Sequence, residues 1–410
     1  MNEKALVKKA AFSFVLLMGI VSLFSDMTHE GAASIIGAYL SLAGASAAAI
    51  GFVSGLGEFI GYSLRLVTGW LTDKTKKYWP ITITGYVIDC MAIPALALVP
   101  RGGWVWACML IVIQRTGKAI KKPAKDTLLS FAASSAGVGR SFAIQELLDQ
   151  IGAFLGPVIL FLVLTLKKNE DLFSVYTICF VVLGLPAIIT VALLFIAKRR
   201  YPEPEKFEPA AKETQPYRLS RSFIFYIIAT SLFAFGFLNF AIITMHTAKT
   251  GLIPADTIPL VYAGAMAVDA FAALFFGWLY DRHGIKVLML SAFMAAPFAV
   301  FVFLIPARWA LFLGVALWGV GMGAQESILK SAVTSIVPKQ NRSSGFGIFQ
   351  TSFGTCWFLG SWFMGYLYDT SILGMTAFSA AMQLVSIPFF LMSSRAHAGV
   401  NNVKQEKASV

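Results

Sequence analysis

Charged residues are scarce in this chain. Asp, Glu, Lys and Arg make up 13% of its 410 residues, whereas a soluble domain typically carries about 25%. Hydrophobic residues make up 57%, and runs of about twenty mostly apolar residues, each long enough to cross a bilayer as a helix, recur along nearly the whole length. The composition excludes an ordinary soluble domain and predicts an all-α polytopic membrane protein.

Cysteine is rare as well. The four cysteines, which all fall within apolar runs and show no CxxC spacing, are Cys90, Cys108, Cys179 and Cys356. This pattern excludes a disulfide framework and a zinc site built from paired cysteines. We interpret the four as small packing residues.

Catalytic and nucleotide-binding motifs are absent from the sequence. It contains no GxxxxGK[ST] loop, no HExxH and no GxSxG. No segment between the apolar runs is long enough to form a separate soluble domain. The sequence therefore predicts neither an enzyme nor an ATP-driven pump, and we expect no cofactor and no bound metal.

The net charge of +12 follows membrane topology rather than a surface for nucleic acid. With the N-terminus inside and twelve spans, 26 of the 33 Lys and Arg residues fall in the N-terminal arm, the inner loops and the C-terminal tail, and two, Arg65 and Arg115, fall within spans. This bias is the positive-inside rule. We therefore expect an integral protein of the cytoplasmic (inner) membrane, with both termini in the cytoplasm, the lipid bilayer around it and no nucleic acid bound.

Twelve spans are predicted, six on either side of a polar segment. The spans cover residues 10–36, 46–72, 79–99, 104–128, 141–166, 172–197, 222–247, 257–281, 285–305, 309–333, 344–368 and 374–394. The polar segment, residues 198–221, is rich in Lys, Arg, Glu and Pro and marks a cytoplasmic linker. The chain should consist of two six-helix bundles, residues 1–197 and 222–394, followed by an unstructured cytoplasmic tail, residues 395–410.

A short motif recurs in the polar gaps of the two halves. Residues 69–74 read GWLTDK, and residues 277–282, 208 positions later, read GWLYDR. A turn repeated at this spacing indicates a duplication. Its glycine lets helix ends approach closely, and its aspartate can accept hydrogen bonds from a neighbouring helix N-terminus. We interpret the following residues as a conformational latch: Gly69, Asp73, Lys74, Gly277, Asp281 and Arg282.

A second echo supports the duplication and leads to a resemblance. Phe142, Ile144 and Gly156 correspond, at a spacing of 204, to Phe346, Ile348 and Gly360. The two GWLxD turns resemble the signatures of the major facilitator superfamily. Residues 114–117, QRTG, resemble its fourth-helix motif in compressed form, and residues 152–157, GAFLGP, resemble its antiporter motif without the later glycine pair. The resemblance, over essentially the full length, implies two pseudo-symmetric six-helix bundles, a central cavity, alternating access by rocking and kinship to drug or metabolite antiporters.

Ionisable residues within the spans are the candidates for transport chemistry, because each costs roughly 2.5–3.5 kcal/mol on insertion scales. In the first span Asp26, His29 and Glu30 share one helical face. Two carboxylates this close repel each other, which favours a proton on one of them, and histidine titrates near neutral pH. The alternative is that His29 and Glu30 form an ordinary helix-end cluster at the outer interface.

The second and fourth spans add further candidates. Glu58 and Arg65 lie on one face of the second span, either as a structural ion pair, as an anchor for the next helix or as transport residues. The resemblance places Arg115 toward the cavity, where it could keep a carboxylate ionised or hold an anionic group of the solute. Lys118, one turn inward, is interpreted as a snorkelling residue at the inner surface.

The fifth and third spans also carry acids. Glu146, Asp149 and Gln150 form a polar stripe on the fifth span. This stripe either meets Arg115 across the first bundle or belongs to the interface that separates during rocking. Asp89, in the third span, is expected to be peripheral and locally satisfied.

The second half is poorer in ionisable groups, so we expect ion coupling to reside in the first half. The candidates for lining the cavity are Asn239, Asp269, Trp318 and Glu326, with the aromatic residues Phe235, Phe237 and Trp357 beside them. Glu326 is also spaced for a pair within its own helix, four residues before Lys330.

These residues favour a proton-coupled secondary transporter of a small solute or ion, a monomer, with antiport (export) ahead of symport. A metal-ion or other cation exporter would use Asp26, His29 and Glu30 as ligands. A proton symporter for a small metabolite is a further alternative, and a sensor would lack solute flux altogether.

One prediction concerns the latch. Replacing Asp73 by Asn should slow transport and loosen the outward-open state while leaving solute binding in place, since the residue is interpreted as a latch and not as a ligand. Binding and transport assays on the purified variant check this. Loss of binding together with normal cycling would contradict the interpretation.

Overall fold

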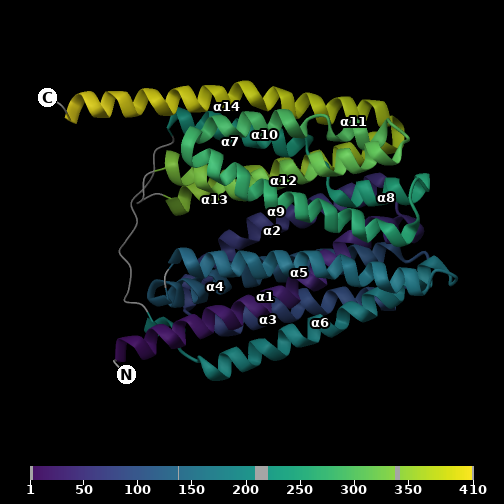
Figure 1. Cartoon of the computed structure of the whole chain (residues 1–410), viewed down its shortest axis with the longest axis horizontal. Helices are drawn as coiled ribbons and strands as arrows, with labels where there is room; N and C mark the ends of the chain where they lie inside the picture. The colour runs from purple at the N-terminus through teal and green to yellow at the C-terminus, as the bar shows by residue number, and fades with distance from the viewer. Residues whose placement is uncertain (1–2, 137, 208–219, 338–341, 409–410) are drawn as a thin grey trace. The chain divides into compact units, whose positions relative to one another are not determined.

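The computed structural model describes residues 3–136, 138–207, 220–337 and 342–408, and within these ranges it contains helices and no strand. Figure 1 shows the labelled helices, coloured in chain order from purple at the N-terminus to yellow at the C-terminus. This confirms the predicted all-α fold class. Some side chains inside the described helices lie outside the described part of the structure, among them those of Asp73, Asp281, Glu326 and Lys330.

The first half of the chain forms six long helices. They are α1 (Glu3–Leu42), α2 (Ala47–Thr75), α3 (Tyr78–Ala95, continued by the 3-10 turn η1, Leu96–Leu98), α4 (Trp104–Ala136), α5 (Val138–Leu166) and α6 (Leu172–Arg200). Each of the first six predicted spans falls on one of these helices. The short 3-10 helix η2 (Pro204–Phe207) follows α6.

The second half contains helices that are interrupted within two of the predicted spans. Its elements are α7 (Arg221–Gly236), α8 (Phe240–Thr250), η3 (Ala255–Thr257), α9 (Ile258–His283), η4 (Gly284–Lys286), α10 (Val287–Ala295), α11 (Phe298–Phe303), α12 (Arg308–Ile336), α13 (Arg342–Thr370) and α14 (Ile372–Ala408). The predicted span 222–247 covers α7 and α8, and the span 285–305 covers α10 and α11. The second interruption coincides with Pro297, which lacks the N–H that a continuous helix needs.

Nine segments of the described chain are long and apolar enough to cross a membrane. They are Val7–Leu42, Ala47–Thr72, Tyr78–Leu98, Ile144–Leu166, Leu172–Arg200, Arg221–Thr250, Ala255–Tyr280, Gly284–Phe303 and Ile372–His397. The other predicted spans fall on α4, α12 and α13. In α4, residues 115–126 include six charged side chains, so its apolar character is interrupted. The protein is thus an integral membrane protein, and the count of twelve crossings stays a prediction.

Two compact units make up the chain. Unit 1 consists of Met1–Ala45, Leu56–Lys212 and Thr244–Ala263, and unit 2 of Ser46–Gly55, Glu213–Ile243 and Gly264–Val410. Two segments therefore group differently from the predicted halves. Residues 46–55 contact α13 within unit 2, where a Cβ atom on Gly51 would lie 2.3 Å from the carbonyl oxygen of Ser361. Residues 244–263 contact unit 1 through Tyr262, whose hydroxyl group donates to Glu30.

Glycines allow close helix crossings in both units. In unit 1, α5 crosses α1 so closely that a Cβ atom on Gly156 would lie 2.2 Å from the carbonyl oxygen of Met27. In unit 2, a Cβ atom on Gly360 of α13 would lie 2.2 Å from the carbonyl oxygen of Phe235 on α7. Membrane helices associate through such small residues because lipid tails provide no hydrophobic driving force between helices. Gly156 and Gly360 are corresponding members of the predicted duplication, and they serve the same packing role.

The loop before α6 is held by its own polar contacts. Asp171 caps α6 by accepting a hydrogen bond from the backbone N–H of Ser174 at 3.1 Å, and it also pairs with Arg101. The backbone hydrogen bond from Ser174, together with the nearby guanidinium, holds the pKa of the Asp171 carboxyl group below its usual range.

The C-terminal tail corrects one expectation. Residues 395–410 were predicted to be unstructured, but α14 continues to Ala408. Extending an existing helix avoids the nucleation cost that disfavours isolated helices. The polar tail can therefore continue the apolar part of α14 without packing of its own.

The crossing of α1 and α5 can be tested with glycine variants. Replacing Gly156 by Ala should lower the free energy of unfolding by about 1–3 kcal/mol, because the methyl group would meet backbone atoms of Met27 and Gly31 that cannot move independently. Thermal unfolding of the purified protein measures this. Gly61→Ala is the matched control, since no atom lies within 4 Å of the position that its methyl group would take. Equal unfolding midpoints for the two variants would contradict the described crossing.

Candidate functional site

Asp89 is the centre of a buried polar network in unit 1. Its carboxylate oxygen Oδ2 accepts from His29 Nε2 at 2.7 Å and pairs with the ammonium group of Lys121, while Oδ1 accepts from Gln114 Nε2 at 2.7 Å. Lys121 also donates to Ser25 Oγ at 2.9 Å. We call these five residues the Asp89 network. They join α1, α3 and α4, which lie together in unit 1 (Figure 1).

The network is dry. Asp89 is fully buried, and His29, Gln114 and Lys121 are each 5–6% exposed. The Lys121 ammonium group also lies 3.8 Å from the centre of the Tyr86 ring, a cation–π contact that strengthens as water is excluded. A carboxylate that is buried this deeply requires a cation and hydrogen bonds, and the network supplies both.

Two predictions about this region are wrong. Asp89 is locally satisfied, as expected, but it was predicted to be peripheral and is fully buried; the lysines that follow Lys118 were counted with the inner loops. Lys121 and Lys125 are instead buried, with Lys125 donating to Ser22 of α1. The reason is that α1 and α3 supply partners for both ammonium groups inside the bundle, Asp89 and Ser25 for Lys121 and Ser22 for Lys125.

A second ionic contact joins α2 and α4. Arg115 Nη1 lies 3.0 Å from Glu58 Oε1, and the two side chains are 26% and 23% exposed. The arginine passes over Gly57, where an added Cβ atom would lie 2.7 Å from Arg115 Cγ. Glycine at this position therefore leaves the space that the arginine side chain occupies.

The partner of Glu58 differs from the predicted one. Arg65 was proposed to share a structural ion pair with Glu58, but its guanidinium group stacks on the ring of Tyr62 at 5.2 Å. The stripe on α5 does not supply the partner of Arg115 either. Its residues bond along their own helix, Gln145 Nε2 to Asp149 at 2.7 Å and Gln150 Nε2 to Glu146 at 3.2 Å.

Glu30 has a tyrosine as its partner. The hydroxyl group of Tyr262 donates to Glu30 Oε2. Arg115 interacts electrostatically with both residues as well as with Glu58. We call Glu30, Glu58, Arg115 and Tyr262 the Arg115 cluster. Unlike the Asp89 network, it contains carboxylates that are only partly buried.

The three candidates on the first span therefore have different surroundings. His29 belongs to the Asp89 network and Glu30 to the Arg115 cluster, although both lie on the same helix. Asp26 interacts electrostatically with Asp149 of α5 and with Lys118 and Lys125 of α4. The side chains thus do not converge on one ligand position.

Metal-ligating atoms do approach one another within the Asp89 network. Among the described residues, one ligand atom each from His29, Asp89 and Cys90 lie within 4.8 Å of one another. The ammonium group of Lys121 already contacts the Asp89 carboxylate, at Oδ2. The arrangement is therefore an internal ion pair, with the lysine in the position of the cation.

Two candidates of the second half, Asn239 and Trp318, lie at the interruption between α7 and α8 in unit 2. Asn239 Oδ1 accepts from the backbone N–H of Ala241 at 3.0 Å, and Trp318 Nε1 donates to the carbonyl oxygen of Leu238 at 2.9 Å. These bonds satisfy backbone groups that the broken helix leaves open. Asp269 is buried beside Gly323 of α12. The side chain of Glu326 lies outside the described residues.

Aromatic rings surround that interruption. Phe237 stacks on Trp318 at 5.6 Å between ring centres, and it lies 5.6 Å from Trp357 and 5.4 Å from Phe298. Phe235 instead contacts Phe378, at 5.3 Å. The site in unit 2 is therefore packed with aromatic rings, whereas the two polar sites in unit 1 contain charged side chains.

The two GWLxD motifs were expected in polar gaps between spans, but they lie in the last turns of helices, α2 and α9, where they share a local contact. Lys74 lies 4.8 Å from the Trp70 ring centre, and Arg282 lies 3.9 Å from that of Trp278. The glycines are not used for close packing here. The nearest atom to a Cβ on Gly69 would be 3.7 Å away, and none lies within 4 Å at Gly277. The expected close approach is therefore absent from the described residues, and the side chains of the latch residues Asp73 and Asp281 lie outside them.

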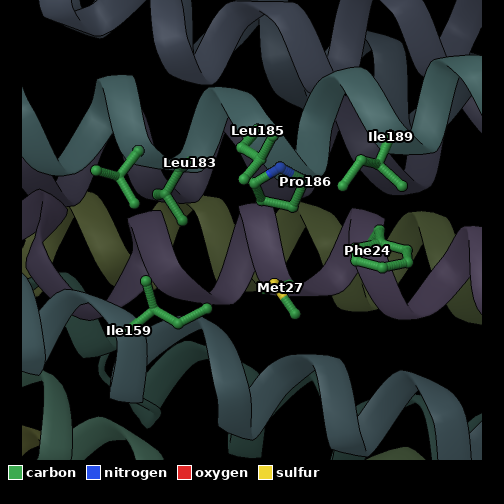
Figure 2. Close-up of a pocket in the computed structure, with 8 residues that line it drawn as sticks. Phe24, Met27, Ile159, Leu183, Leu185, Pro186 and Ile189 are labelled. Atoms are coloured by element: carbon green, nitrogen blue, oxygen red, sulfur yellow. The ribbon is translucent and has the colours of Figure 1, made fainter.

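A pocket in unit 1 is separate from these polar sites. It has a volume of about 120 Å³ and is lined by Phe24, Met27, Ile159, Val182, Leu183, Leu185, Pro186 and Ile189. Figure 2 shows seven of these labelled side chains from α1, α5 and α6, none of them polar. Such a lining offers nothing to bind a polar solute or a proton, so we do not assign the pocket to transport.

Several of the residues described above could not be found from the sequence alone. Tyr262 is 232 positions from Glu30, and Gly57 gives no signal until its neighbour is known. Gln114 and Lys121 did carry a signal, because polar residues seven apart share a helical face.

The chain resembles known proteins in sequence. The family model described as Major Facilitator Superfamily matches residues 224–409. The chain is 36% identical over 387 residues to an uncharacterized protein of Mycobacterium tuberculosis, covering 92% of each. It is 24% identical over 383 residues to an uncharacterized MFS-type transporter of Methanocaldococcus jannaschii, covering 90% of this chain and 91% of that one.

A solved structure agrees with this placement. The crystal structure of a D-xylose-proton symporter matches the fold with a TM-score of 0.68 at 13% sequence identity, covering 93% of this chain and 96% of that one. This likeness shows the fold alone, and the family match and the MFS-type relative identify the protein as a transporter of small solutes and not an enzyme. The chain belongs to the major facilitator superfamily.

Proposed function

We propose that the protein is a proton-coupled secondary transporter that exports a small solute in exchange for protons across the cytoplasmic membrane. It would work as a monomer with both termini in the cytoplasm. The observation that carries the proposal is the Arg115 cluster, in which two carboxylates and one guanidinium group lie partly exposed on membrane-spanning helices. Lipid does not tolerate such groups, so their exposed surface must face water.

The balance of charges in unit 1 supports a proton site. Leaving aside residues within two turns of a helix end, with η1 counted as the continuation of α3, the helices of unit 1 carry seven carboxylates and six cations. The carboxylates are Asp26, Glu30, Glu58, Asp89, Asp126, Glu146 and Asp149, and the cations are Arg65, Arg115, Lys118, Lys121, Lys122 and Lys125. One carboxylate is thus in excess. A proton or a cationic solute would neutralise it.

Glu30 is the carboxylate that best fits the proton site. Glu58, Asp89 and Asp126 are each in an ion pair, with Arg115, Lys121 and Lys122 respectively. Glu30 accepts from a neutral hydroxyl group instead. Tyr262 can remain hydrogen-bonded to Glu30 in either protonation state, because a phenol both donates and accepts.

Exchange follows if the proton and the solute compete. A cationic solute entering the cluster would be attracted by the same excess negative charge that holds the proton. Occupation by one would then disfavour the other, which is the thermodynamic requirement for antiport. Asp26 and Asp149, which interact with each other electrostatically, would take part as a second acidic pair, since Asp26 also interacts with Glu30.

A second candidate is proton symport of an anionic metabolite, and Arg115 favours it. Protonation of Glu58 would release the guanidinium group from its ion pair, and guanidinium groups bind carboxylate and phosphate groups in a forked geometry. The proton and the solute would then bind together. The sign of the pH dependence of solute binding separates this candidate from exchange.

Export of a metal ion has less support. That function would require Asp26, His29 and Glu30 to act as ligands of one ion. His29 is bonded to Asp89, and Glu30 to Tyr262. We therefore keep proton exchange as the proposed function.

Identifying the solute is the first experiment. A thermal-shift screen of the purified protein against a solute library, at two pH values, detects ligands because binding to the folded state raises the unfolding midpoint. A hit is then followed in proteoliposomes under an imposed pH gradient. Flux that ignores the gradient for every hit would exclude proton coupling.

The role of Glu30 gives a sharp prediction. Glu30→Gln should abolish flux driven by a pH gradient while leaving solute exchange without a gradient measurable, because the amide cannot take up a proton. Proteoliposome flux with and without the gradient measures both. Glu170→Gln is the control, since Glu170 pairs with Lys167 in the loop between α5 and α6. Gradient-driven flux at the wild-type rate in Glu30→Gln would move the coupling site to Glu58 or Asp26.

The path of Arg115 gives a second prediction. Gly57→Ala should reduce solute affinity about tenfold, the equivalent of one strong hydrogen bond to a charged group, because the new methyl group would displace Arg115 Cγ. Gly61→Ala, one turn further along α2, should leave the affinity unchanged. Equal affinities for the two variants would show that Arg115 does not contribute to binding in this position.

A further inference from the structure

Two anchor points fix the position of α4. Gln114 and Lys121 are seven residues apart and therefore lie on one face of the helix, two turns from each other. Gln114 bonds to Oδ1 of Asp89 and Lys121 to Oδ2. Contacts at two heights to the same carboxylate restrict both the rotation of α4 about its axis and its sliding along α3.

The backbones of α3 and α4 are close at this point. A Cβ atom on Gly117 would lie 2.5 Å from the backbone nitrogen of Asp89, and one on Gly85 would lie 2.5 Å from that of Lys121. Gly85 on α3 and Gly117 on α4 thus allow the two helices to cross closely beside the Asp89 carboxylate. The close crossing allows a side chain as short as aspartate to reach both partners on α4.

His29 extends the anchor to α1, and its tautomer follows from the geometry. The Gln114 amide must turn its nitrogen toward Asp89, because its oxygen would repel the carboxylate. The same nitrogen lies 3.1 Å from His29 Nδ1, so Nδ1 accepts and carries no proton. The proton is on Nε2, which donates to Asp89. His29 is therefore a neutral, fully bonded imidazole.

Arg115 follows Gln114 directly in the sequence. Neighbouring positions on a helix point about 100° apart, so fixing Gln114 toward α1 and α3 directs Arg115 to another side of α4. On that side Arg115 meets Glu58 of α2 at 3.0 Å. The anchor is dry and the ion pair is partly exposed, so the two neighbouring residues connect a rigid interior to a solvated site.

We propose that the Asp89 network positions Arg115: it sets the rotation of α4 so that the guanidinium group is held against Glu58. Gln114, Asp89, His29 and Lys121 are then positioning residues for the solute site and neither ligands nor proton carriers. The relevance to transport rests on the proposed function of the Arg115 cluster. The positioning itself is a property of unit 1 and is tested without any solute.

The test measures how readily Arg115 reacts with phenylglyoxal in the full-length purified protein, by mass spectrometry of the modified peptides. An ion pair protects a guanidinium group from this reagent. Gln114→Met, which keeps the length of the side chain and removes its hydrogen bonds, should raise the rate at Arg115 about threefold to fivefold, the range for losing one partly exposed ion pair. Glu58→Gln should raise it by a similar factor, since it removes the partner directly.

Controls separate positioning from a general loss of structure. Thr116→Ala changes the other neighbour of Arg115, whose hydroxyl group donates to the carbonyl oxygen of Val112 within the same helix, and should leave the rate unchanged. Arg65, stacked on Tyr62, should react at one rate in every variant. If Gln114→Met changes both arginines equally, or neither, the proposal is wrong. An unchanged rate in Glu58→Gln would also overturn it, because the ion pair would then not hold Arg115.

A second variant keeps the test decisive if Gln114→Met fails to fold. Gln114→Ala removes the side chain beyond Cβ, so no larger side chain has to be accommodated in the core. It should raise the rate at which Arg115 reacts with phenylglyoxal by the same factor. Once a solute is known, the reduction in affinity caused by Gln114→Met should vanish in an Arg115→Lys background, since positioning acts only through Arg115. Additive losses in that double variant would indicate a purely structural role. Failure of the exchange proposal would leave the phenylglyoxal result unaffected.

Discussion

An ionised group inside a membrane-spanning bundle needs a counter-charge, hydrogen bonds or water, and this constraint explains the arrangement of unit 1. Asp89, which is fully buried, satisfies it through Lys121, His29 and Gln114. Glu58 satisfies it through Arg115 while remaining partly exposed. The cost of an unmet charge, about 2.5–3.5 kcal/mol on insertion scales, is large enough that each of these contacts must be retained for the bundle to insert and pack.

The buried Asp89 network and the partly exposed ion pair of Glu58 with Arg115 suit different roles. A dry, saturated network has few alternative arrangements, because moving any member leaves a buried polar atom without a partner. An exposed ion pair can exchange its partner for a proton, a solute or water at lower cost. Since Gln114 and Arg115 are adjacent on α4, one helix carries both, and its rigid contacts lie next to its exchangeable ones. Around the α7–α8 interruption of unit 2, aromatic rings and backbone capping prevail instead.

Much of the fold was accessible from the sequence because the signals were long and periodic. The runs of apolar residues located the helices, and the repeated GWLxD turn indicated two related halves, an indication supported by the matching roles of Gly156 and Gly360. The interruption at Pro297 and the one after Gly236 were not predicted. Both interruptions lie within continuous apolar runs, and hydropathy alone does not distinguish a continuous helix from a broken one.

The site was only partly accessible. The sequence identified Glu30, Glu58 and Arg115 as candidates because each is ionisable within a span, but partners depend on tertiary packing, which periodicity along one helix does not reveal. Asp89 was misplaced for the same reason: its importance comes from two residues on α4 and one on α1. Lys121 and Lys125, which lie within α4, were counted with the inner loops because burial of a lysine is rare unless it has a partner.

The proposed exchange depends on the helix interiors of unit 1, which hold one carboxylate more than their cations neutralise, and on competition between solute and proton for that carboxylate. Calorimetric titration of the purified protein with its solute, in two buffers of different ionisation enthalpy, counts the protons exchanged on binding. The account predicts release of about one proton per solute bound near neutral pH. Binding with no change in bound protons would contradict it.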